Sequence, residues 1–199
     1  MRSVLLVCIA IFPLLVCSGI VYTVLSLYMA ELGTTKSQIG LLYTFGALAG
    51  AITSPLLGRL GDKWGRKPLL LASMALFSTV FAGFALARNP KDLLFIMLLE
   101  GSAWGALGTS ANALIADLVP PEKRGTALGV YNTAWNLGWI IGPVTGGVLS
   151  DCLGFRKTFL LSSLFILVGF SLGLALLPSK AEVSQAGSGD GPGGSAPEA

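Results

Sequence analysis

Long apolar stretches alternate with short polar ones along this chain of 199 residues. Six of the apolar stretches approach the ~20 residues that a helix needs to cross the hydrocarbon core of a bilayer. The segments between them are short and contain the Gly, Pro and charged residues typical of turns. The pattern therefore predicts an all-α membrane protein in which neighbouring helices run antiparallel. The predicted spans cover about residues 4–29, 39–57, 69–86, 93–116, 126–149 and 159–177.

The composition agrees with a membrane location. Hydrophobic residues make up 53% of the chain and charged residues only 12%, whereas a soluble domain carries about 25% charged residues. Residues 1–178 form the predicted six-span domain, and the Gly-, Ser- and Pro-rich residues 179–199 are predicted to be a disordered cytoplasmic tail. The first apolar run also has features of a signal peptide. It continues to Tyr28, however, which favours a membrane span over a signal sequence.

Lys and Arg are distributed unequally between the two sets of loops. The set that includes the N-terminus holds eight cations, four of them within residues 58–67, and the opposite set holds five. Because cytoplasmic loops carry an excess of Lys and Arg, we expect both termini to be cytoplasmic. The expected location is an integral, multi-pass position in the plasma or inner membrane. The net charge of +3 comes from these loops and does not indicate binding to nucleic acid.

Part of the segment after span 2 recurs later in the chain. Residues 55–67 hold a Pro, a Gly three positions on, then an Asp, a Gly and an Arg-Lys pair, and residues 143–157 repeat this order. A shift of three spans places the second copy on the opposite face of the membrane. The pattern predicts two inverted three-helix repeats, which is a transporter architecture. The alternative is coincidence, since Gly and Pro are common in membrane helices.

Small residues recur at every fourth position in spans 2 and 5, so each set lines one face of its helix. In lipid, such faces let two helix backbones approach closely, and close packing is the plainer explanation of both. Span 5 also contains Pro143, which removes a backbone hydrogen bond and permits a bend. The sets are Gly46, Gly50, Ser54 and Gly58 in span 2 and Ala134, Gly138, Gly142 and Gly146 in span 5.

The segment Gly58-x-x-x-Asp62-x-x-Gly65-Arg66-Lys67 resembles the motif between spans 2 and 3 of the major facilitator superfamily, with every fixed position filled. This resemblance implies a transporter that is equivalent to one half of the family's twelve-span fold. It also implies that these residues form a charge latch that sets the balance between outward-open and inward-open states. Asp117 and Arg124, which follow span 4, resemble the family's acid-x6-Arg pair and are expected to join the same latch.

Span 5 narrows the expected class. Gly138-x-x-x-Gly142-Pro143-x-x-Gly146-Gly147 resembles the antiporter motif of proton-coupled drug exporters in the family. The resemblance implies export of a small amphiphilic compound. One position departs from the pattern of proton-coupled members, because Met97 stands where their span 4 motif has an Arg, four residues before Gly101. A role for that Arg therefore does not carry over.

Glu100 is the charged residue expected inside span 4. A bare carboxylate is costly there, and protonation relieves the cost. A carboxyl group that takes a proton from one side and releases it to the other is what coupling requires, so Glu100 is the predicted proton or cation site. A neutral, hydrogen-bonded structural Glu is the alternative.

Polar and aromatic residues cluster in spans 4 and 5. They are candidates to line a cavity, because an amphiphile needs amide and aromatic contacts in an apolar site. Interhelical hydrogen bonds and interface anchoring are the plainer explanations for each one. The candidates are Asn112, Asn132, Asn136, Trp104 and Trp135, with Trp139 beside them.

Other classes of function are less favoured. The chain has no His and three scattered Cys, so we expect no metal site and no cofactor. An enzyme is not expected: an intramembrane aspartyl protease needs paired acids within the bilayer, whereas the cations beside Asp62 place it in water. A non-transporting membrane subunit or regulator would keep the fold without needing Glu100.

Six spans are half of the family's usual twelve. The expected partners are therefore membrane lipid, a small-molecule substrate, and a second six-helix unit. That unit would be another copy in a homodimer or a separate half-size transporter. Alternatively the chain is a fragment of a twelve-span transporter.

Overall fold

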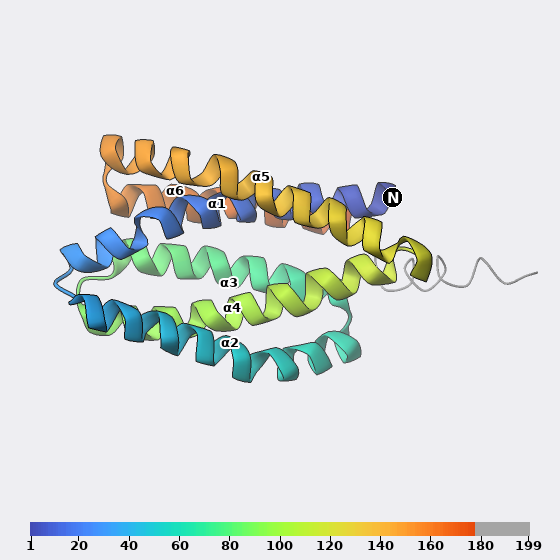
Figure 1. Ribbon diagram of the computed structural model, residues 1–199, viewed down its shortest axis with the longest axis horizontal. Coiled ribbons are helices and arrows are strands. Elements are labelled where there is room, and N and C mark those ends of the chain that lie inside the picture. The colour runs from blue at the N-terminus through green and yellow to red at the C-terminus, as the bar shows by residue number, and fades with distance from the viewer. Residues whose placement is uncertain (178–199) are drawn as a thin grey trace, which may run out of the picture.

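The computed structural model describes residues 1–177, and this part of the chain is all-α. It confirms the predicted fold of six long helices, which lie side by side in a bundle (Figure 1). The predicted tail, residues 179–199, lies outside the described residues. The helices are α1 (Arg2–Glu31), α2 (Lys36–Trp64), α3 (Arg66–Leu86), α4 (Pro90–Asp117), α5 (Arg124–Leu153) and α6 (Phe155–Leu176), with a short 3₁₀ turn, η1 (Pro121–Lys123), before α5.

The helices extend beyond the apolar runs. α2 continues to Trp64, so the charged residues 59–63 lie on its last two turns and the connection to α3 is confined to Gly65. Hydropathy marks only the part of a helix that would sit in hydrocarbon, whereas the backbone bonds continue into the polar interface. The expectation of a separate loop over residues 58–67 was therefore wrong in extent.

Local sequence explains where α2 and α4 begin. Thr35 caps α2, and its side chain and that of Gln38 exchange bonds with each other's backbone N–H groups. In the first turn of α4, the carboxylate of Asp92 accepts bonds of 2.9 and 3.1 Å from the N–H groups of Arg88 and Asn89. These donors favour the charged carboxylate, so they hold the pKa of Asp92 below its usual value.

Five of the six helices are long and apolar enough to cross a membrane. α5 is the exception within the described residues, since polar residues such as Asn132 and Asn136 lower its hydropathy. It is nevertheless 30 residues long, or about 45 Å at the rise of an α-helix, and it packs along α1. α5 therefore runs through the same layer as the others.

The two three-helix repeats are interlocked. α1 packs mainly against α5 and α6 of the second repeat, and α4 packs mainly against α2 and α3 of the first. α3 and α6 then join the two groups. If α1, α2 and α3 are exchanged for α4, α5 and α6, the same pairs of helices are in contact, as the predicted inverted repeat requires. The α2–α3 and α5–α6 turns also correspond, because Gly65 and Gly154 have positive φ values of 108° and 79°.

Glycine-lined seams hold the closest pairs of helices. A methyl group added at Gly142 of α5 would lie 2.6 Å from the Cα of Gly19 in α1, and one added at Gly50 of α2 would lie 2.8 Å from the Gly101 carbonyl oxygen in α4. The small-residue faces thus pack backbone against backbone, as predicted. α1 lies at the centre of the bundle, whereas α2 and α5 keep most of their apolar side chains exposed.

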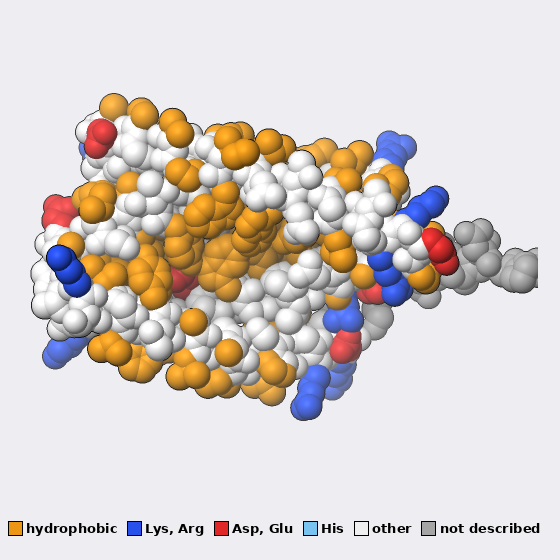
Figure 2. All heavy atoms as spheres, in the orientation of Figure 1, with side chains coloured by type: hydrophobic (Ala, Val, Ile, Leu, Met, Phe, Trp, Pro, Cys, Tyr) orange, Lys and Arg blue, Asp and Glu red, His pale blue; other side chains and the backbone are white. Residues whose placement is uncertain are grey.

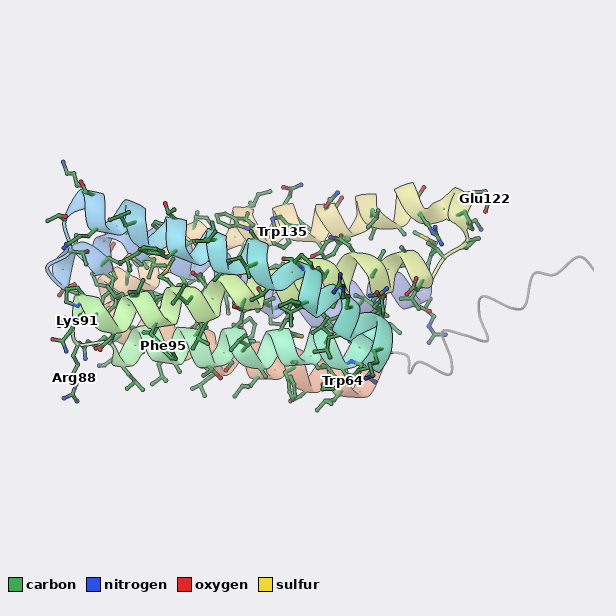
Figure 3. The ribbon with its side chains drawn as sticks, turned by 90° about the horizontal axis from the view of Figure 1, so that it is seen from below. Trp64, Arg88, Lys91, Phe95, Glu122 and Trp135 are labelled. Atoms are coloured by element: carbon green, nitrogen blue, oxygen red, sulfur yellow. The ribbon has the colours of Figure 1, made fainter. Side chains whose placement is uncertain are left out.

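On the face that Figure 2 shows, the Lys and Arg side chains lie at the two ends of the molecule, and hydrophobic side chains are spread over the surface between them. One end carries the N-terminus, the α2–α3 turn and the α4–α5 connection; we call it the N-terminal end (Figure 1). Trp64 and Glu122 lie there, and Arg88 and Lys91 lie at the opposite end (Figure 3). This separation matches the two sets of loops that the sequence predicts.

Candidate functional site

Glu100 is buried in the bundle, with only 2% of its surface exposed. It lies ten residues after Pro90, the first residue of α4, and so about 15 Å along the helix. Neither of the two ion pairs within residues 1–177 involves it, since both are formed by Arg66. Within the described residues, Glu100 is therefore stabilised by hydrogen bonding rather than by an ion pair with a cation.

Tyr22 of α1 provides that hydrogen bond. Its hydroxyl donates to Oε1 of Glu100, and the indole N–H of Trp104 donates to the Tyr22 hydroxyl over 2.5 Å. Trp104 lies one helical turn after Glu100, so both side chains leave the same face of α4. Three residues from two helices that are distant in sequence thus form one polar chain.

A cavity of about 410 Å³ opens beside this chain, between α2 and α4. Tyr22, Tyr43, Glu100 and Trp104 supply its polar and aromatic wall, and glycines on the two helices are part of the rest of its lining. Tyr43 bonds to Ser26 rather than to Glu100, with a distance of 3.1 Å between the hydroxyl oxygens. A carboxyl beside three aromatic rings in an apolar cavity can bind a proton or an amphiphilic molecule.

Aromatic rings extend the site from α1 and α4 to α5. The ring centroids of Tyr22 and Trp139 are 6.1 Å apart, those of Trp104 and Trp135 are 5.4 Å apart, and Phe77 of α3 lies 4.8 Å from Trp104. Trp135 points from α5 toward the other helices (Figure 3). One face of the molecule also has a hollow with hydrophobic side chains along its floor (Figure 2).

The three predicted Asn residues do not contact Glu100. Asn132 and Asn136 are exposed and share one face of α5, because they are four positions apart, and Trp135 follows Asn132 by three positions. Asn112 is also exposed and donates to the carbonyl of Gly108 in its own helix, over 2.9 Å. Trp104 and Trp135 therefore belong to the aromatic site, whereas the Asn residues stay candidates for its rim.

The predicted latch residues converge at the N-terminal end of the bundle. Arg66 pairs with Asp62 one turn away across Gly65, and its Nε lies 3.7 Å from Asp117 at the end of α4. The same guanidinium reaches the carbonyl of Gly58 at 3.5 Å. We call Asp62, Arg66 and Asp117 the charge cluster. It joins α2, α3 and α4, although its members are partly exposed and each pair contributes little stability.

Two charged residues of the predicted latch lie outside this charge cluster. Lys67 points to the end of α6, where its Nζ donates to the carbonyls of Leu174 and Leu177. Arg124 donates to the carbonyl of Ala116 over 3.3 Å, and within residues 1–177 no ion pair joins it to Asp117. Asp117 thus enters the charge cluster through Arg66, whereas Arg124 stays bound to backbone.

The antiporter-type residues of α5 divide into two groups. Gly138, Gly142 and Gly146 face α1, where an added methyl would lie within 2.5–2.7 Å of its atoms. Gly147 has no neighbour within 4 Å of such a methyl. The helix stays continuous across Pro143. In this structure the motif is a packing seam between α5 and α1.

Sequence patterns did not identify Tyr22 as a site residue. Tyr22 and Glu100 are 78 positions apart, and no spacing rule connects two different helices. The one available signal was a hydroxyl-bearing ring within an apolar span. No group of three or more potential metal ligands occurs among the described residues.

Comparisons with known proteins place the chain in a family. The family model described as Major Facilitator Superfamily matches residues 7–197. The multi-drug resistance efflux pump PmrA of Streptococcus pneumoniae is 33% identical over 163 residues, which are 80% of this chain and 41% of PmrA. The multidrug resistance protein MdtG of Citrobacter koseri is 37% identical over 161 residues, or 78% of this chain and 39% of MdtG.

The fold has a solved relative. The crystal structure of the human organic anion transporter MFSD10 (TETRAN) superimposes with a TM-score of 0.71 at 22% identity, covering 89% of this chain and 47% of that one. The chain thus spans about two fifths of the length of PmrA and MdtG and about half of the solved chain. These matches agree with the expectation that the chain is not an enzyme. The family model covers nearly the whole sequence, and the chain belongs to the major facilitator superfamily.

Proposed function

We propose that the chain forms one half of a secondary transporter that exports a small amphiphilic compound in exchange for protons, by alternating access. Two observations support the substrate class: PmrA and MdtG are named as multidrug efflux or resistance proteins, and the cavity is apolar and aromatic with one acid. Glu100 is the proposed coupling group. The charge cluster is the proposed element that biases the two transport states.

The burial of Glu100 beside the cavity carries this proposal. A carboxylate away from water is stabilised by protonation, and the same group in a wetter state releases its proton. A change in the access of water to the cavity therefore changes the proton affinity of Glu100. This change couples the movement of protons to the movement of substrate. Since Glu100 lines the cavity itself, substrate and proton meet at one place.

The test is dye transport by the full chain in vesicles under an imposed pH gradient, with a panel of fluorescent amphiphilic dyes. We expect proton-driven dye movement that Glu100→Gln abolishes and that Glu100→Asp partly keeps, because Asp still titrates. Glu122→Gln is the matched control, since Glu122 is an exposed acid on η1. Undiminished proton-driven transport by Glu100→Gln would contradict the coupling role. A chain that moves no dye, alone or with a second unit, would favour a non-transporting subunit.

A second six-helix unit is part of the proposal. Apolar side chains such as Leu48 and Ile52 of α2 and Ile140 and Val144 of α5 are exposed, and a hollow with a hydrophobic floor is open on one face (Figure 2). The relatives are more than twice as long as the matched region. Either another copy or a separate half would cover the hollow and complete the substrate path.

Crosslinking in membranes distinguishes these partners. Ala47 lines the cavity on α2, so Ala47→Cys, in a chain whose three native Cys are replaced, should crosslink to whatever covers the hollow. Leu164→Cys on α6, another exposed position, is the control. A homodimer and a heteromer give different masses, and a chain that stays monomeric while transporting would contradict the need for a second unit.

We also propose that both termini are cytoplasmic, because more Lys and Arg lie at the N-terminal end. Cys152 is exposed at the opposite end, whereas Cys8 and Cys17 are buried. A membrane-impermeant maleimide should therefore label Cys152 on intact cells. Trp64→Cys in a Cys152→Ser background should be labelled only after permeabilisation, and the reverse result would invert the topology.

A further inference from the structure

The polarity of the hydrogen bonds around Tyr22 is determined by chemistry. An indole N–H only donates, so the Tyr22 hydroxyl must accept the 2.5 Å bond from Trp104. A hydroxyl has one proton to give, and that proton points at Oε1 of Glu100. Oε1 is therefore an acceptor in this arrangement. The order of donation runs from Trp104 through Tyr22 to Glu100.

The surroundings of Glu100 leave the charged form dependent on this bond. The titratable groups that line the cavity with it are Tyr22 of α1 and Tyr43 of α2, and Tyr43 is bonded to Ser26 instead. α3 and α5 present the rings of Phe77 and Trp135 to Trp104. Hydrogen bonds to a carboxylate are about twice as strong as those to a neutral acceptor, so the Tyr22 bond weakens when Glu100 takes a proton.

A change in that bond reaches the aromatic rings. Hydrogen bonds in series polarise one another, so a weaker Tyr22–Glu100 bond also weakens the bond from Trp104. Trp104 contacts rings from α3 and α5, and Tyr22 contacts Trp139. The protonation state of one carboxyl is thereby linked to side chains from α1, α3, α4 and α5.

We infer that Tyr22 is a positioning residue, which holds Glu100 as a hydrogen-bond acceptor and passes its protonation state to Trp104 and the aromatic rings that contact it. The inference rests on one part of the proposed function, namely that Glu100 takes up and releases a proton, and it does not require that the chain moves a substrate. The role of Tyr22 follows from contacts that the proposed coupling step does not itself require.

The experiment follows the carboxyl and the indole separately in the full chain in vesicles. Infrared difference spectra over a pH series report the protonated carboxyl band of Glu100, which Glu100→Gln identifies by removing it. Fluorescence reports Trp104 in a variant whose Trp64, Trp135 and Trp139 are replaced by Phe. Wild type should show both signals changing with one midpoint.

Tyr22→Phe removes the donor and keeps the ring. We expect the carboxyl midpoint to rise by about one pH unit or more, because the charged form loses its bond, and we expect the Trp104 response to disappear. Tyr43→Phe is the matched control, and it should leave the carboxyl midpoint and the Trp104 response unchanged. An unshifted midpoint or a persisting Trp104 response in Tyr22→Phe would overturn the inference.

Trp104→Phe provides an independent check if Tyr22→Phe does not fold. It removes the N–H group that donates to the Tyr22 hydroxyl, so the carboxyl midpoint should rise by less than in Tyr22→Phe. An unchanged midpoint would contradict the proposed link from Trp104 through Tyr22 to Glu100. If the wild-type chain moves no dye but the Tyr22-dependent titration is present, the proposed function fails and the role of Tyr22 stands. If dye transport is proton-driven but Tyr22→Phe does not change the titration of Glu100, the proposed function stands and the role of Tyr22 fails.

Discussion

Lys67 of α3 donates a hydrogen bond of 2.5 Å to the carbonyl oxygen of Leu177, at the end of α6. The opposite end of the bundle repeats the arrangement, since Nη2 of Arg156 in α6 lies 2.8 Å from the carbonyl oxygen of Ala87, at the end of α3. The last carbonyls of a helix lack partners within it and form the negative end of its dipole. α3 and α6 are therefore tied to each other at both ends.

Replacing either cation should destabilise the bundle. A cation at a helix C-terminus contributes about 0.3–2 kcal/mol, depending on its burial, so Lys67→Met and Arg156→Met should each lower the free energy of unfolding by that order. Thermal unfolding in detergent measures this as a lower midpoint. Lys157→Met is the control, since Lys157 is exposed and next to Arg156. Equal midpoints for Arg156→Met and Lys157→Met would contradict the proposed capping role.

The charge cluster should affect switching between transport states. Asp62→Asn removes one of the two carboxylates that Arg66 contacts, so we expect slower dye transport with unchanged dye binding. Arg66→Gln removes both pairs and should slow transport further. Rates are measured in vesicles, and binding is measured by equilibrium titration of the same variants. Lost binding with normal switching would show that the charge cluster serves the substrate site instead.

The seam between α1 and α5 should not accept a methyl group. In Gly142→Ala the new Cβ would lie 2.6 Å from the Cα of Gly19 and from the carbonyl of Val16, and overpacking of this kind costs about 1–3 kcal/mol. Gly147→Ala is the matched control, because nothing lies within 4 Å of its added methyl. Unfolding midpoints should fall for the first and stay or rise for the second. A similar unfolding midpoint for both variants would mean that the contact between α1 and α5 can accommodate a methyl group.

The α5–α6 turn should require glycine itself. Gly154 has φ 79° and ψ 162°, a region that essentially only Gly occupies and that costs about 1–3 kcal/mol for other residues. Asn tolerates ordinary left-handed turns but not this ψ value, so Gly154→Asn and Gly154→Ala should lower the unfolding midpoint alike. Gly129→Ala, in the open face of α5, should not. Rescue by Asn alone would point to a different backbone at the turn.

Sequence patterns predicted the helices well because each apolar run has to satisfy its backbone within lipid. They also predicted the inverted repeat. In the structure, Gly65 and Gly154, which occupy matching places in the two copies, both have a positive φ value. The ends of α2 were missed, because charged residues such as Arg59 and Lys63 continue the helix beyond the apolar run. Hydropathy is also an incomplete guide to α5. Polar residues spread along this helix lower its hydropathy, although it packs against α1 within the same bundle.

The site was predicted only in part, for a different physical reason. The cost of a buried charge singled out Glu100 from its position alone. Tyr22 depends on how α1 crosses α4, and Lys67 depends on where α6 ends; neither is encoded in local spacing. Arg124 was expected in the latch because Asp117 and Arg124 resemble the family's acid-x6-Arg pair, yet the Arg124 side chain donates to the backbone carbonyl of Ala116 after the turn at η1.

The interlocked repeats have a consequence for biogenesis. α1 is made before α5, yet α5 is its closest partner within the described residues, and Gly142 of α5 follows Gly19 by more than a hundred residues. Until α5 is inserted, α1 has only lipid along this seam. Neither three-helix repeat has a core of its own, so separating the chain between α3 and α4 leaves two segments that must find each other in the bilayer before either is complete.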